Sequence, residues 1–167
     1  SKCVFLQTSK RHLDAVAFHD GRSALSDTGE SITIPLDAAL DWHRALPQQK
    51  PRIRLLAHTS FCGSTLLARC LGDLPGVVSY REPQPLIEWS DWAQSKSPDT
   101  GLKTIYAFVL GQYAKTWDET DIAVLKPSNW ANDRMLSHLP TDGRTLMVTL
   151  TIDARDTPLA TAQARAA

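Results

Sequence analysis

The segment from His58 to Arg69, which reads HTSFCGSTLLAR, holds the residues whose types and spacing are best suited to chemistry. It follows a short apolar run, RIRLLAH, and precedes a helical pattern, so we expect a strand, a tight turn and a helix. The first turn of a helix leaves backbone N–H groups unpaired, and the helix dipole adds roughly half a positive charge there. Gly63 lets the backbone approach an anion closely, and the hydroxyls of Ser64 and Thr65 add donors. The turn therefore predicts an anion site.

This loop differs from a Walker A loop, which needs two glycines four residues apart followed by Lys and Ser or Thr. Ser60 stands in place of the early glycine, and no lysine precedes Ser64. ATP with magnesium is therefore a less expected ligand, and the balancing charge must come from elsewhere in the fold. A strand-to-helix turn that is capped by Ser or Thr and binds nothing is the alternative interpretation.

Two further polar groups follow predicted strands. Glu82 follows GVVSY, a strand expected beside the one that precedes the loop, and Lys126 ends IAVLK. Because ligands in parallel sheets bind beyond the carboxyl ends of the strands, we expect both groups to share one site with the loop. Glu82 is a candidate general base or else a surface carboxylate paired with Arg81 or Arg52. Lys126 is a candidate electrostatic clamp or an ordinary strand-end lysine.

Strands alternate with helices along most of the chain, which predicts an α/β fold with a mostly parallel central sheet flanked by helices. Besides the strands already named, TLMVTLTID is a predicted strand. The predicted helices are LDAALDWHRAL, residues 64–74, two helical stretches between Pro85 and Trp117, NWANDRMLSHL, and a last one beginning at TPLATAQARAA. The segment from Cys3 to Leu36 reads as short strands with a tight turn at Asp20-Gly21. We therefore divide the chain into a small β-rich N-terminal hairpin and helix extension, residues 1–50, and a core, residues 51–167.

The composition bounds the class of protein. The chain has 167 residues with 18 basic and 18 acidic side chains, so no general attraction to nucleic acid is predicted. No apolar run reaches the roughly 20 residues of a membrane span, and we expect a soluble cytoplasmic protein. The three cysteines and five histidines show no metal-ligand spacing, so no metal site is predicted. Cys70 is expected to be buried, as are three of the five tryptophans.

HTSFCGSTLLAR, followed by GVVSYREPQPL, resembles the phosphosulfate-binding loop of the sulfotransferase family. These are P-loop-like, three-layer α/β enzymes that use 3′-phosphoadenosine 5′-phosphosulfate (PAPS) as the sulfuryl donor. The likeness to the bacterial and carbohydrate-modifying branch, whose loop is close to Arg-x-Gly-Ser-Thr-Leu-Leu, spans roughly Ile53 to Thr161. It is strongest at the loop and at Arg81-Glu82-Pro83.

The resemblance implies roles for individual residues. The donor would be held by the loop residues Ser60, Phe61, Cys62, Gly63, Ser64 and Thr65. Glu82 would be the general base, and Lys126 would supply a cation. Phe61 departs from the family pattern because it aligns with a basic loop residue that helps the nucleotide leave. His58 or Arg69 could compensate, although Arg69 also fits a solvated surface position.

The resemblance further implies that Arg155 and Thr161 hold the 3′-phosphate of the donor, with a shift of two residues for the arginine. The chain ends before the family's distal nucleotide-closing loop, so we expect the core to be incomplete at its C-terminal side. The expected activity is sulfuryl transfer from PAPS to a hydroxyl or amine of a small molecule or glycan. The alternatives are another P-loop transferase, such as a small-molecule kinase, and a non-catalytic module that binds a nucleotide or a partner protein.

Overall fold

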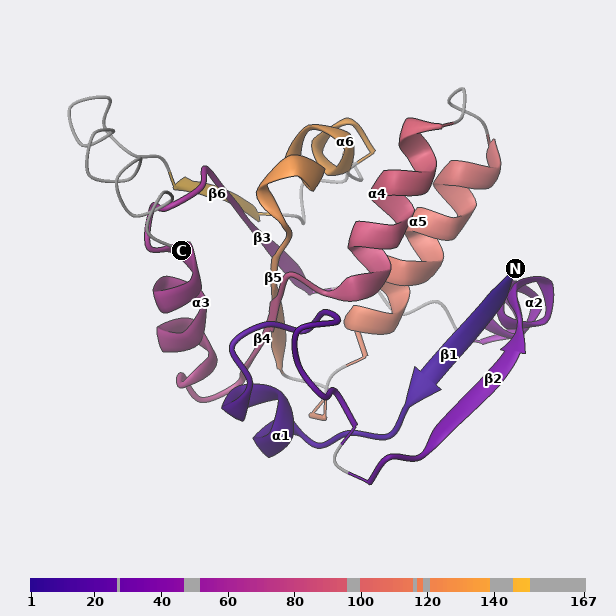
Figure 1. Cartoon of the computed structure of the whole chain (residues 1–167), viewed down its shortest axis with the longest axis horizontal. Coiled ribbons are helices and arrows are strands. Elements are labelled where there is room, and N and C mark those ends of the chain that lie inside the picture. The colour runs from indigo at the N-terminus through magenta and orange to yellow at the C-terminus, as the bar shows by residue number, and fades with distance from the viewer. Residues whose placement is uncertain are drawn as a thin grey trace.

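A computed structural model gives the fold of the chain. It describes residues 1–26, 28–46, 52–95, 100–115, 117–118, 121–138 and 146–150. The described residues form a mixed α/β structure in which helices flank a parallel sheet, as the sequence predicts (Figure 1). The predicted helix after residue 157, together with Arg155 and Thr161, lies outside the described residues.

The central sheet contains four parallel strands in the order β4-β5-β3-β6. Their bounds are β3 Ile53–His58, β4 Val77–Arg81, β5 Ile122–Lys126 and β6 Leu146–Leu150. Side chains on both faces of β3, β4 and β5 are buried, which explains why these strands read as continuous apolar runs. β5 separates β3 from β4, so the expectation that β4 lies beside the loop strand is wrong. The chain passes over one strand position on its way to β4, and β5 fills that position later.

Helices cover both faces of the sheet (Figure 1). On one face, α3 (Ser64–Gly72) packs its apolar side against the sheet around Leu56 and Val124. On the other face, α4 (Gln84–Gln94) and α5 (Thr100–Tyr113) enclose the larger core. Trp89 lies in this core, stacked on Tyr106 with ring centroids 4.4 Å apart. The short 3₁₀ helix η1 (Asn129–Ala131) and α6 (Asn132–Ser137) pack beside α4.

The N-terminal region contributes a separate antiparallel pair of strands, β1 (Lys2–Leu6) and β2 (Ser31–Pro35), and the helix α2 (Leu36–Ala45). α2 packs against α5, with the His43 ring against Phe108. The segment between β1 and β2 also forms a helix, α1 (Lys10–Ala15), where the sequence predicted strands. α1 has only six residues, which is too short for an apolar helical period to stand out, but Ser9 caps it by accepting a hydrogen bond from the His12 N–H at 3.2 Å.

The chain leaves two neighbouring strands toward opposite faces of the sheet. After β3 it turns into α3, and after β5 it turns into η1 and α6 on the face that carries α4. Such a divergence at the carboxyl ends of adjacent parallel strands is the place where α/β sheets bind ligands. The loop after His58 and the segment after Lys126 therefore border the expected site.

Candidate functional site

The loop that follows β3 is built by two residues with left-handed backbones. Phe61 has φ 60° and Gly63 has φ 77°, and together they turn the chain from the strand into α3. Glycine adopts this conformation without cost, whereas a phenylalanine there is strained. The Phe61 side chain is nonetheless 60% exposed to solvent. The left-handed backbone of Phe61 costs conformational energy, and its apolar ring is left in contact with water. Both features favour a functional explanation for this position.

The amide groups at the start of α3 are open. Within the described part of the chain, the backbone N–H groups of residues 61–65 donate no hydrogen bond to a protein acceptor. Gly63 occupies the N-cap position, so no side chain caps the helix. Ser64, whose side chain is buried, and Thr65 open the helix. This arrangement leaves several donors and the positive end of the helix dipole to an incoming anion.

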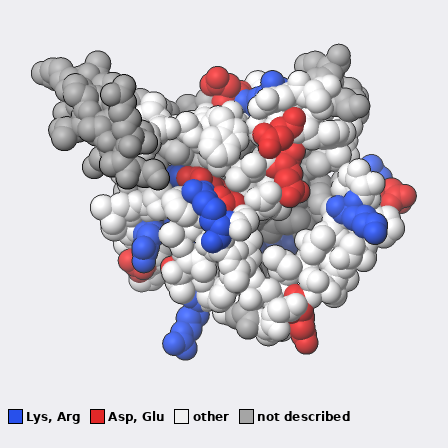
Figure 2. Space-filling model, in the orientation of Figure 1, with Lys and Arg blue, Asp and Glu red and all other residues white. Residues whose placement is uncertain are grey.

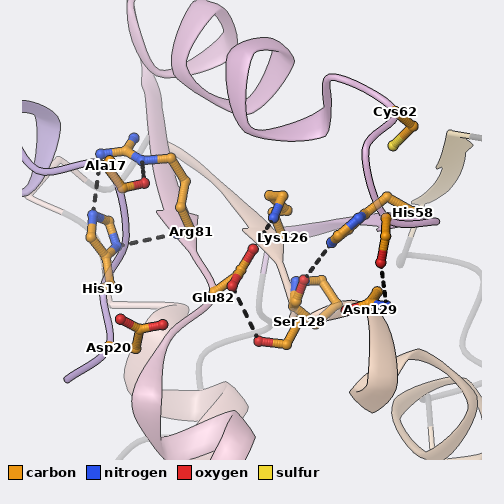
Figure 3. Close-up of polar contacts among 12 residues, drawn as sticks. Ala17, His19, Asp20, His58, Cys62, Arg81, Glu82, Lys126, Ser128 and Asn129 are labelled. Carbon is orange, nitrogen blue, oxygen red and sulfur yellow. Dashed lines mark hydrogen bonds and ion pairs between the residues drawn. The ribbon is translucent and has the colours of Figure 1, made fainter. Parts of the chain in front are cut away.

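Hydrogen bonds fix the loop to the segment after β5. Asn129 Nδ2 donates to Ser60 Oγ at 2.7 Å, and Asn132 Nδ2 donates to the His58 carbonyl oxygen at 2.6 Å. The buried His58 ring lies between the two segments, with Nδ1 2.9 Å from the Thr59 carbonyl oxygen and Nε2 2.8 Å from that of Pro127 (Figure 3). Both ring nitrogens of His58 therefore face backbone carbonyl oxygens, and neither is directed at the amides of the loop.

Glu82 and Lys126, predicted separately, are in direct contact. Lys126 Nζ donates to Glu82 Oε1, and the lysine is only 1% exposed. Ser128 Oγ donates to Glu82 Oε2 at 3.4 Å, and Figure 3 shows the carboxylate pointing toward both partners. The Glu82 backbone has φ 53°, so it and Phe61 are the non-glycine residues with positive φ among those described. Both lie at carboxyl ends of strands, where strained backbone often accompanies a site.

The loop after α1 adds a cation that the sequence did not reveal. Arg22 Nη2 donates to Glu82 Oε2 at 2.6 Å and also to Asp20, while Arg22 Nε lies 2.9 and 2.8 Å from the two Asp20 oxygens. The guanidinium also stacks 3.7 Å over the centre of the Phe18 ring. Hydrogen bonds from Arg22 lower the pKa of Asp20, and the same bonds raise the pKa of Arg22. Only the turn at Asp20-Gly21 was predictable here, and it forms, with Ser23 N–H donating to the Asp20 carbonyl at 3.1 Å.

Arg81 anchors this N-terminal loop to β4. Its guanidinium is buried and donates to the carbonyl oxygens of Leu13 (2.5 Å), Val16 (2.7 Å) and Ala17 (3.3 Å). His19 Nδ1 accepts a hydrogen bond from the backbone N–H of Arg81 at 3.2 Å. The ring proton is therefore assigned to Nε2, which lies 3.0 Å from the Leu13 carbonyl oxygen. Burial lowers the pKa of His19 to about 4, so the ring is neutral at neutral pH. These contacts hold Asp20 and Arg22 against Glu82.

The structure thus brings most of the predicted site residues to one edge of the sheet. The loop residues 60–65 lie together after β3, Glu82 contacts Lys126, and the adjacent residues Ser128 and Asn129 connect the two groups.

Arg69 is exposed on α3, as expected. Cys70 is also exposed, so its predicted burial is wrong: it falls on the solvent side of α3, next to Arg69. Of the five tryptophans, Trp89 alone is buried, which is fewer than the three expected.

Charged side chains of both signs are interspersed on the face that Figure 2 shows, in agreement with the neutral net charge. Among the described residues, no group of three His, Cys, Asp or Glu side chains is placed to hold a metal ion. The helices of the described ranges include none with the length and apolarity to cross a membrane.

Comparison of the chain with protein-family models, with curated proteins and with solved structures finds no match.

Proposed function

We propose that the protein is a P-loop-like sulfotransferase that moves a sulfuryl group from PAPS to a hydroxyl or amine of a small molecule or glycan. One observation carries the proposal. The open amides of residues 61–65 lie at the same sheet edge as a buried carboxylate–lysine pair, and hydrogen bonds from Asn129 and Ser128 connect the two. An anion cradle beside a carboxylate and a cation is what transfer of a charged group to a hydroxyl needs.

The geometry and the sequence resemblance support a role for each of the predicted residues. The backbone N–H groups of residues 61–65 would bind the 5′-phosphosulfate, because they are unpaired donors at the start of α3. Glu82 would accept the proton of the acceptor, and Lys126 would stabilise negative charge on the donor. Arg155 and Thr161 remain predictions for the 3′-phosphate. Phe61, exposed at the loop apex, leaves this loop without the family's cation.

One observation favours the non-catalytic alternative, a module that only binds a nucleotide or a partner. The Glu82 carboxylate forms ion pairs with both Arg22 and Lys126, so each of its two oxygens is bonded to a cation. A carboxylate that is bonded in this way is not positioned to accept a proton from an acceptor hydroxyl. Catalysis therefore requires that these ion pairs loosen when the donor binds.

Thermal denaturation tests the proposed donor. Adenosine 3′,5′-bisphosphate, the desulfated product, is expected to raise the melting temperature, because a ligand at about 100 times its Kd adds about 2.7 kcal/mol to the free energy of unfolding. ATP with magnesium is the matched control and is expected to give a much smaller shift. If ATP with magnesium raises the melting temperature and the bisphosphate does not, the result would favour a kinase over a sulfotransferase. If neither ligand raises the melting temperature, the non-catalytic partner-binding module is the function that remains.

A further inference from the structure

We propose that Arg22, Glu82 and Lys126 form a charge switch for the anion site: ionised Glu82 pairs with both cations, and the cluster gains a net positive charge when Glu82 takes up the proton of the acceptor. This inference rests on the proposed function and extends it by adding Arg22, from the N-terminal region, to the anion-binding residues. It explains how a loop without its own lysine obtains positive charge only when the reaction needs it.

The charge count of the cluster carries the first step. Arg22 and Lys126 face the carboxylates of Asp20 and Glu82, so the cluster is formally neutral. Arg81, next in sequence, is directed away from Glu82 toward the carbonyls of residues 13–17. His19, beside Arg81, is neutral at neutral pH because burial lowers its pKa. No further charged side chain contacts Glu82 among the described residues. A neutral cluster offers an incoming anion little attraction.

The positions of the two cations carry the second step. Lys126 is 1% exposed, and its amine bonds to Glu82, so the carboxylate neutralises its charge. The Arg22 side chain is 53% exposed, and Nη1 makes no contact with a described residue, although Asp20, Glu82 and the Phe18 ring fix the guanidinium. An arginine that is held rigidly and still presents a free nitrogen to solvent is suited to bind an anion.

Proton uptake then couples to anion binding. When the acceptor oxygen forms its bond to sulfur, its O–H bond breaks and the proton passes to Glu82, while the electron pair of the breaking S–O bond goes to the leaving phosphate oxygen. The cluster gains one positive charge as the leaving phosphate gains negative charge. Transfer of the proton to Glu82 therefore breaks its ion pairs with Arg22 and Lys126 while the leaving phosphate is still bound at the loop.

Glu82→Gln tests the switch because the amide imitates the neutral carboxyl while keeping its size. Binding of inorganic pyrophosphate and of adenosine 3′,5′-bisphosphate would be measured by calorimetry on the whole chain. Glu82→Gln is expected to tighten binding of both about tenfold, equal to about 1.4 kcal/mol. Arg22→Gln is expected to weaken it about tenfold, and Arg22→Lys to restore most of the loss. Glu30→Gln, exposed on the chain before β2, changes the net charge equally and is expected to have no effect.

The outcomes separate the switch from the proposed function. Should Glu82→Gln bind no more tightly than the wild type, or Arg22→Gln bind equally well, the switch is wrong even if the bisphosphate binds. Tighter pyrophosphate binding without any bisphosphate binding supports the switch and overturns the donor assignment. Arg22→Gln decides the question if Glu82→Gln fails to fold, since its side chain is half exposed. If no variant binds either anion, both proposals fall.

Discussion

Replacing Glu82 with glutamine is expected to lower the turnover of PAPS at least about 100-fold without loss of nucleotide binding. A general base contributes about 10²–10⁴-fold to the rate, and the amide cannot accept the acceptor's proton. The side chain keeps its size and its place beside Lys126, so the donor site remains formed. The measurement is the rate at which adenosine 3′,5′-bisphosphate is released from PAPS, with an acceptor found by screening hydroxyl and amine compounds.

Glu88→Gln is the matched control for this experiment. Glu88 is exposed on α4, six residues from Glu82, and contacts Gln84 but none of the network residues. Its replacement removes the same charge from the same helix-proximal region, and turnover is expected to be unchanged. Equal turnover in Glu82→Gln and the wild type would remove Glu82 from the mechanism.

Arg81→Met is expected to lower the free energy of unfolding by about 3 kcal/mol, because several carbonyl acceptors lose their donor and each unsatisfied buried group costs about 1–3 kcal/mol. The Arg81 side chain is 1% exposed and donates to carbonyl oxygens of the segment from Leu13 to Ala17. Methionine fills similar space but donates nothing, so the buried Leu13 carbonyl and the partly buried carbonyls that follow it lose their partners. Urea denaturation followed by circular dichroism measures the difference.

Arg69→Met provides the comparison for this substitution. Arg69 is exposed on α3, and its loss is expected to change the free energy of unfolding by less than about 0.5 kcal/mol. A loss below about 1 kcal/mol in Arg81→Met would show that the N-terminal segment does not depend on the arginine. The position of Arg22 over Glu82 would then lack its support.

The sheet and the loop could be predicted because their signals are local. β3, β4 and β5 are buried on both faces, so each is a short apolar run in the sequence. The change from such a run to a helical period predicted both the turn at Gly63 and the start of α3 at Ser64. The carboxyl-end rule then indicated that Glu82 and Lys126 would share an edge with the loop.

Other features depend on tertiary contacts that leave no local pattern. The placement of β5 between β3 and β4 follows from the path of the whole chain, and so does the contact between Glu82 and Lys126. Arg22 reaches Glu82 across 60 positions of sequence because Arg81 fixes the segment before it. A lone arginine in a polar turn gives no sign of such a role. The same limit explains the wrong prediction for Cys70. Its residue type favours burial, but the packing of α3 leaves it exposed to solvent.

The backbone amides of residues 61–65 provide the most direct test of the central claim, which is that the start of α3 holds an anion without a lysine. Two-dimensional ¹H–¹⁵N NMR spectra would be recorded while adenosine 3′,5′-bisphosphate is added. The largest shifts are expected at the amides of Cys62, Gly63, Ser64 and Thr65, with saturation at one equivalent. Saturable binding that leaves these four amides unshifted, with the shifts elsewhere on the chain, would contradict the account.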